Sequence, residues 1–115
     1  MISLIVDEAY AFDYLSILEV KKEKLPNSKN LDAFDICAKH IRNQTGEQLF
    51  YEIINSPEYN LLFKANEETF EAVEKARYGS ISAKKVDDLN MNRYNKKIAL
   101  QKKFFPNSIL KETKT

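Results

Sequence analysis

Only two glycines and three prolines occur among the 115 residues of this chain, so few positions can interrupt a helix. No segment shows the sustained alternation of β-branched residues that indicates a strand. Hydrophobic residues make up 43% of the chain and charged residues 30%, a balance typical of a globular domain. The sequence therefore predicts an all-α fold, a compact bundle of about five helices, three long and two shorter, with no β-sheet.

The prolines and glycines divide the chain into five helical segments. The predicted helices are Leu4–Lys24, Leu31–Asn43, Glu47–Asn55, a fourth from Pro57 to just before Gly79, and a fifth that follows Ser82 and ends before Pro106. Asn30, Ser56 and Ser82 precede three of these helices and are predicted to cap them. We expect one helical domain over residues 1–106 and a frayed polar tail over residues 107–115.

Polar residues interrupt the apolar stripes of three predicted helices. At about 100° per residue, Asp13 falls among apolar residues of the first helix. That stripe consists of Ile2, Val6, Ala9, Tyr10, Ile17 and Val20. Asn66 and Arg77 fall on the stripe of the fourth helix, and Arg93 falls on that of the fifth. Because a buried charge is destabilising unless it is paired, we expect these groups to meet in one polar cluster.

The first helix has apolar side chains on nearly every side. Phe12, Tyr14, Leu15 and Leu18 lie off its main stripe. A helix of this kind is typically buried, so we expect it at the centre of the bundle, where Asp13 can meet more than one neighbour.

The expected polar cluster centres on an ion pair. The Asp13 carboxylate can accept two hydrogen bonds from the guanidinium of Arg93 or Arg77, and Asn66 can complete the network. Further candidates lie beside these groups at helical spacing or flank Asp13 with hydroxyl groups. The complete set of predicted site residues is Asp13, Asn66, Arg77, Asn90, Arg93, Lys97, Tyr10 and Tyr14.

Three interpretations of this cluster follow from its composition. An Asp13–Arg93 salt bridge could serve only to fix the order of the helices. Alternatively, Arg77, Arg93 and Lys97 outnumber the single carboxylate, and a pocket with excess positive charge suits a carboxylate or phosphate ligand. In the third interpretation these stripes face another protein chain.

Residues with metal-binding or catalytic chemistry are sparse. Cys37 and His40 share one side of the second helix, but zinc needs three or four ligands and no second pair is present. Glu68, Glu71 and Glu74 have a spacing that suits magnesium, yet they face away from the apolar stripe, as a solvated surface does. No Glu-x-x-His motif or glycine-rich phosphate loop occurs. The sequence predicts no catalytic residue, metal or cofactor, and disfavours an enzyme.

Charge is strongly segregated along the chain. Residues 1–74 hold 7 Lys/Arg and 14 Asp/Glu, a net charge of −7, whereas residues 75–115 hold 11 and 3, a net charge of +8. Such asymmetry is found in proteins that bind nucleic acid. The lysines of the fifth helix are spread around it rather than gathered on one face, which favours neutralisation of the acidic helices or a solvated surface.

These patterns predict a protein-interaction module, or a small regulatory or partner subunit, that binds another protein or forms a homo-oligomer. The seven Phe and six Tyr and the lack of catalytic motifs favour this function. The alternatives are binding of a small anionic ligand in a polar pocket between helices, and nucleic-acid binding through the basic C-terminal helix. The apolar start of the chain lacks a basic leader, and no apolar run is long enough to cross a bilayer. We expect a cytoplasmic protein without a membrane association.

Overall fold

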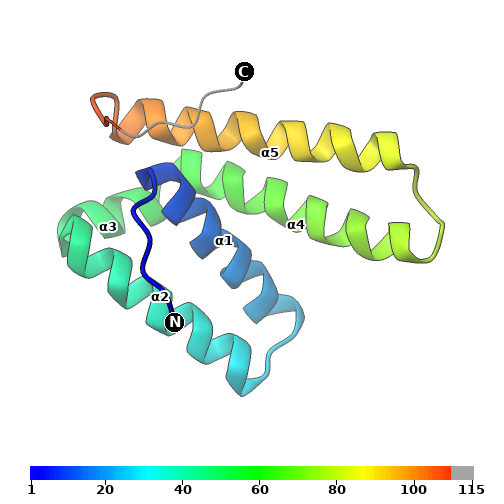
Figure 1. Cartoon of the computed structure of the whole chain (residues 1–115), viewed down its shortest axis with the longest axis horizontal. Helices are drawn as coiled ribbons and strands as arrows, with labels where there is room; N and C mark the ends of the chain where they lie inside the picture. Colours follow the sequence, from blue (N-terminus) through cyan, green and yellow to red (C-terminus); the bar gives the residue numbers. More distant parts are fainter. Residues whose placement is uncertain (110–115) are drawn as a thin grey trace.

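Five helices make up the regular structure of residues 1–109, the part of the chain that the computed structural model describes (Figure 1). They are α1 (Glu8–Lys24), α2 (Ser28–Thr45), α3 (Glu47–Ile54), α4 (Pro57–Arg77) and α5 (Ala83–Phe104). The described residues contain no strand, so the predicted all-α bundle is confirmed. Four helices have at least 17 residues and α3 has 8, so one helix rather than two is short. The predicted polar tail lies outside the described residues from position 110 onward.

Side-chain caps define the starts of most helices. Ser56 and Ser82 cap α4 and α5 as predicted, each accepting a hydrogen bond from the backbone N–H three residues later. The start of α2 was predicted too late. Asn27, not Asn30, is its cap, because the Asn27 side chain accepts from the backbone N–H of Asn30 at 2.9 Å. Gly46 follows α2 with φ of 90°, a conformation that favours glycine.

The start of α1 also differs from the prediction. The Asp7 carboxylate accepts a hydrogen bond from the backbone N–H of Tyr10 at 2.6 Å, and α1 begins at the next residue, Glu8. Residues 1–6 are not helical, and their side chains are exposed. A helix from Leu4 was the wrong expectation because a carboxylate satisfies the free N–H groups of a first turn, which an apolar side chain cannot do.

The central helix is α1, as predicted, since it packs against α2, α4 and α5. Its buried surface includes Ala9 and Val20 of the stripe expected from the sequence but extends beyond that stripe. Phe12 and Leu15 are fully buried, whereas Tyr10 is half-exposed. The buried apolar core consists of Ala9, Phe12, Leu15, Ile41, Phe50, Ile53, Tyr59, Leu62 and Leu100. Since α1 has neighbours on several sides, no single stripe describes its buried surface.

The residues just after α5 close one end of the core. The Phe105 ring stacks on the Phe12 ring, with centroids 6.3 Å apart, and Phe50 approaches Phe12 from α3 at 6.1 Å. The Ser108 hydroxyl donates to a carboxylate oxygen of Glu8 at 2.6 Å. The tail was expected to be frayed from residue 107, but Ser108 contacts the start of α1.

Candidate functional site

The Asp13 carboxylate joins three helices. It projects from α1 and accepts two hydrogen bonds from Arg93 of α5, from Nε to Oδ1 at 3.3 Å and from Nη2 to Oδ2 at 2.8 Å. The Asn66 side chain of α4 donates to Asp13 Oδ1 at 3.0 Å and also to the hydroxyl of Ser16. The predicted contacts of Asp13 with Arg93 and Asn66 are therefore present in the structure.

This arrangement explains how the fold accommodates a buried charge. Asp13 is only 3% exposed, and a carboxylate so placed is strongly destabilising unless donors surround it. The fork of a guanidinium matches both carboxylate oxygens, and the Asn66 amide supplies a third donor. The side chain of Arg93 is 32% exposed, so the positive partner keeps contact with solvent while the negative partner does not.

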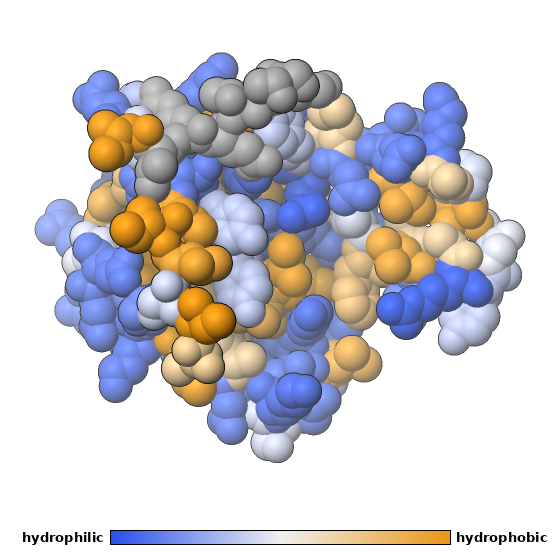
Figure 2. All heavy atoms as spheres, viewed as in Figure 1, coloured by the Kyte–Doolittle hydropathy of each residue, from blue (hydrophilic) through white to orange (hydrophobic). Residues whose placement is uncertain are grey.

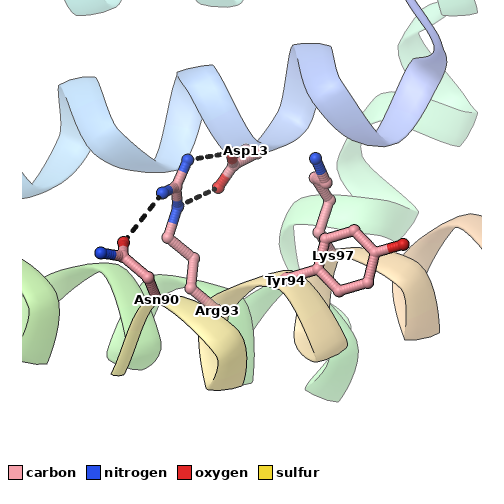
Figure 3. A pocket seen from close by; sticks show the side chains of 5 residues that line it. All are labelled: Asp13, Asn90, Arg93, Tyr94 and Lys97. Atoms are coloured by element: carbon pink, nitrogen blue, oxygen red, sulfur yellow. Dashed lines mark hydrogen bonds and ion pairs between the residues drawn. The ribbon is translucent and has the colours of Figure 1, made fainter. Parts of the chain in front are cut away.

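A cavity of about 260 Å³ opens beside this ion pair, between α1 and α5 (Figure 3). Its lining residues are Asp13, Asn90, Arg93, Tyr94 and Lys97. The four residues from α5 are spaced at i, i+3, i+4 and i+7, so they share one face of this helix, and the predicted Asn90, Arg93 and Lys97 all lie on it. Arg93 Nη1 also donates to the Asn90 side-chain oxygen, at 3.4 Å.

Lys97 contributes a second cation to the cavity, and it is only 6% exposed. Its Nζ lies 5.6 Å from the ring centroid of Tyr94 and 5.8 Å from that of Tyr10, within the range of cation–π attraction. Burial lowers the pKa of Lys97, and the positive charge of Arg93 lowers it further. The negative charges of Asp13 and Asp7 act in the opposite direction on this pKa.

Three predicted members of the cluster lie outside it or at its edge. Arg77 is 69% exposed near the end of α4, where it pairs with Glu74 at 3.6 Å. Its helical phase is right, but it is eleven residues beyond Asn66, or about 16 Å further along the helix axis. Tyr14 is half-exposed, and Tyr10 contributes its ring near Lys97. Arg77 was therefore wrongly expected in the cluster, because it lies too far along the axis of α4 to reach Asp13.

Two buried polar residues of this region were not predicted. Ser16 is fully buried and accepts from Asn66, and its position three residues after Asp13 gives it the same helical face. Gln101 is 3% exposed. Its side-chain oxygen accepts from the backbone N–H of Ala9 at 2.8 Å, so it caps the first turn of α1 from another helix. Gln101 lies one turn after Lys97 on the same face of α5, a spacing that would have indicated it.

The other residues considered for chemistry lie apart from this cluster. Within residues 1–109, no group of three or more His, Cys, Asp and Glu side chains is placed to hold a metal ion. His40 is exposed, and its ring nitrogen Nε2 lies 2.9 Å from Gln44 Nε2. Burial raises the pKa of the Cys37 thiol, which favours its unreactive protonated form.

Within the described residues, the pair of Arg93 and Asp13 joins the basic α5 to an acidic helix, but the acidic residues of α4 pair elsewhere. Glu67 and Glu71 of α4 pair with Lys24 of α1, at 3.2 and 2.9 Å, rather than with a lysine of α5. Lys84 pairs with Asp88 one turn later in its own helix, at 3.9 Å. Most lysines of α5 are therefore solvent-exposed side chains on the surface of the bundle.

A second surface feature is the set of apolar side chains left in water. Ile2, Leu4 and Ile5 are 85%, 77% and 91% exposed. Figure 2 shows apolar atoms gathered on one face of the molecule, where Figure 1 draws the N-terminal segment. On α2, Leu31 and Ile36 are exposed as well. We refer to residues 1–6 as the apolar arm.

The fold and these sites define the class of the protein: an all-α, five-helix bundle with a polar cluster on its central helix and an exposed apolar arm. No family model, curated protein or solved structure has significant similarity to the chain. None of its helices within residues 1–109 has the length and apolar character that a membrane span requires.

Proposed function

We propose that this chain is a non-catalytic protein-interaction module, a partner or regulatory subunit that binds another protein through the apolar arm and α2. The exposure of the arm carries this proposal. Burying a side chain such as Ile2, Leu4 or Ile5 is worth roughly 1.5–3 kcal/mol, and this fold leaves all three in water. Contiguous exposed apolar surface is typical of sites that bind protein.

Helix α2 supports the same function. Of the 18 residues of α2, Ile41 is the one that is buried. Beside α2 lies a groove of about 530 Å³, with Leu15, Phe34 and Phe50 among its apolar lining residues. Charged residues including Asp35 line it too. An apolar floor with a polar rim is the usual anatomy of a protein interface.

Site-specific photo-crosslinking in the producing cell tests this function. A photoreactive phenylalanine analogue would replace Leu4 in one variant and Ile36 in another, with Glu68 on the exposed face of α4 as the matched control. We expect the first two variants to form the same discrete crosslinked product and the Glu68 variant to form none. A product with twice the mass of the chain would identify the partner as a second copy. Equal labelling at all three positions, or no product at either apolar position, would contradict the function.

A further inference from the structure

The outer side of α2 carries opposite charges in its two halves. Asp32 and Asp35 lie in the first half of the helix, and both are exposed. Lys39, which is also exposed, and Arg42 lie in the second half. At about 100° per residue, all four fall on one side of α2, away from the buried Ile41. This side of the helix therefore changes from negative to positive along its length.

The helix dipole does not explain this separation of charge. Its effect on charged side chains falls off within the first and last turns, and the first turn of α2 holds no acidic residue. Asp35 and Lys39 lie further inside the helix. Their spacing of four residues would allow an ion pair within α2, yet neither forms an ion pair with any of the described residues. Both charges are therefore available to a partner outside the chain.

A second copy of the chain presents the complementary pattern. When two identical helices pack antiparallel around a twofold axis, the first half of each helix faces the second half of the other, and every contact occurs twice. With the axis at the level of residue 37, Asp35 lies level with the partner's Lys39. In the same register, Asp32 lies level with the partner's Arg42. One register thus matches both acidic residues with basic ones, and this agreement favours a second copy over an unrelated protein.

Apolar side chains beside these charges support the same pairing. Leu31 and Ile36 are 42% and 56% exposed, and α2 lies at the edge of the bundle (Figure 1). Their burial would supply affinity, while the charges would fix the register of the two helices. We infer that α2 packs antiparallel against α2 of a second copy, with two reciprocal ion pairs between Asp35 and the partner's Lys39. This inference rests on the protein-interaction function proposed above and names the partner.

Charge reversal followed by sedimentation velocity tests this pairing. We expect the unmodified chain to form dimers as its concentration rises. Asp35→Lys and Lys39→Asp should each weaken dimerisation by about tenfold or more, because each change places two like-charge pairs in the interface. The double variant Asp35→Lys/Lys39→Asp should regain the lost affinity, since opposite charges again lie level with one another. Asp87→Lys, at an exposed position of α5, is the matched control and should leave the affinity unchanged.

A mixture of the two single variants gives a second test. One variant is positive at both positions and the other is negative at both, so a dimer with one chain of each kind has both pairs matched. The mixture should dimerise at concentrations where neither variant does alone. A chain that stays monomeric up to about 1 mM would overturn the inference, as would charge reversals without effect or without rescue by the double change and by mixing.

The failure of this inference is distinguishable from the failure of the proposed function. A monomeric chain that still forms a discrete crosslinked product with a different protein in the producing cell would overturn the α2 pairing alone. A monomeric chain that forms no crosslinked product at either apolar position would contradict both.

Discussion

At the scale of single residues, we expect the buried carboxylate of Asp13 to be sensitive to substitution. Asp13→Ala leaves the guanidinium of Arg93 and the amide of Asn66 without their acceptor. We expect the free energy of unfolding in urea at pH 7 to fall by about 3 kcal/mol, the lower end of the range for breaking a buried pair, because Arg93 reaches solvent. A loss below about 1 kcal/mol is typical of exposed pairs and would contradict the burial of this one.

A double-mutant cycle separates the ion pair from the packing around it. Asp13→Ala combined with Arg93→Met should be less destabilising than the two single changes added together, by at least about 1 kcal/mol. Arg77→Met is the matched control, since Arg77 is an exposed arginine whose change should stay within about 0.5 kcal/mol. Additive losses at Asp13 and Arg93 would show that the two side chains are not coupled.

Because of Tyr59, we expect the stability of the folded state to depend on pH in the alkaline range. Its hydroxyl donates to Glu19 Oε1 at 2.9 Å, and burial, together with the charge of Glu19, raises the pKa of Tyr59 far above its ordinary value near 10. Above about pH 10 an unfolded tyrosine loses its proton while the folded one keeps it, so the folded state binds more protons and stability falls as pH rises.

Replacing this hydroxyl should remove that loss. Between pH 9 and 11 the Tm of Tyr59→Phe should fall less steeply than that of the unmodified chain, because phenylalanine has no proton to lose. Thermal denaturation across this interval measures both slopes. Tyr78→Phe, at a highly exposed position, should retain the slope of the unmodified chain. Parallel curves for Tyr59→Phe and the unmodified chain would show that Tyr59 does not cause the loss.

At the scale of helices, the first turn of α1 depends on a residue 92 positions away in the sequence. Gln101→Leu would leave the buried N–H of Ala9 without an acceptor, which should lower the free energy of unfolding by about 1–3 kcal/mol. Hydrogen exchange should accelerate over the first turn of α1 more than over its middle. Gln48→Leu, on the exposed side of α3, is the control and should change neither quantity. Uniform acceleration along α1 would show that Gln101 has no local effect.

Helix ends and long-range contacts differ in how far the sequence predicts them. Ser56 and Ser82 cap their helices through bonds that span three residues, so local pattern was enough to find them. The same local rule applied to Asp7 would have corrected the start of α1, which the apolar residues before it obscured. Gln101 could not be found as a cap from sequence, because its acceptor role depends on where α5 crosses α1.

The polar cluster, too, could be predicted only in part from the sequence. Helical phase placed Asp13, Asn66 and Arg93 on inward faces, and the need to pair a buried charge then predicted their contact. Helical phase does not give the distance of a residue along the helix axis, which is why Arg77 was wrongly included in the predicted cluster. The stripe of α1 was incomplete for a related reason. Ala9 and Val20 are buried as expected, but a helix with three neighbours buries more than one face.

At the scale of the whole molecule, the helices are unequally anchored. α1 packs against three other helices and buries seven side chains, whereas α2 buries one, Ile41. Local stability follows the apolar surface that a segment buries, so weakly buried segments open without global unfolding. The molecule thus combines a well-buried central helix with a peripheral helix, and the peripheral helix lies next to the apolar groove.

Native-state hydrogen exchange should resolve this difference. We expect amides of residues 30–40 in α2 to exchange through local openings, with a smaller opening free energy and a weaker dependence on urea than amides of residues 12–20 in α1. Equal protection and equal urea dependence in the two helices would mean that α2 opens only when the whole fold does. If a protein partner covers α2 as proposed, the added partner should slow exchange in α2 and leave α1 unchanged, because burial of Leu31 and Ile36 would stabilise the peripheral helix alone.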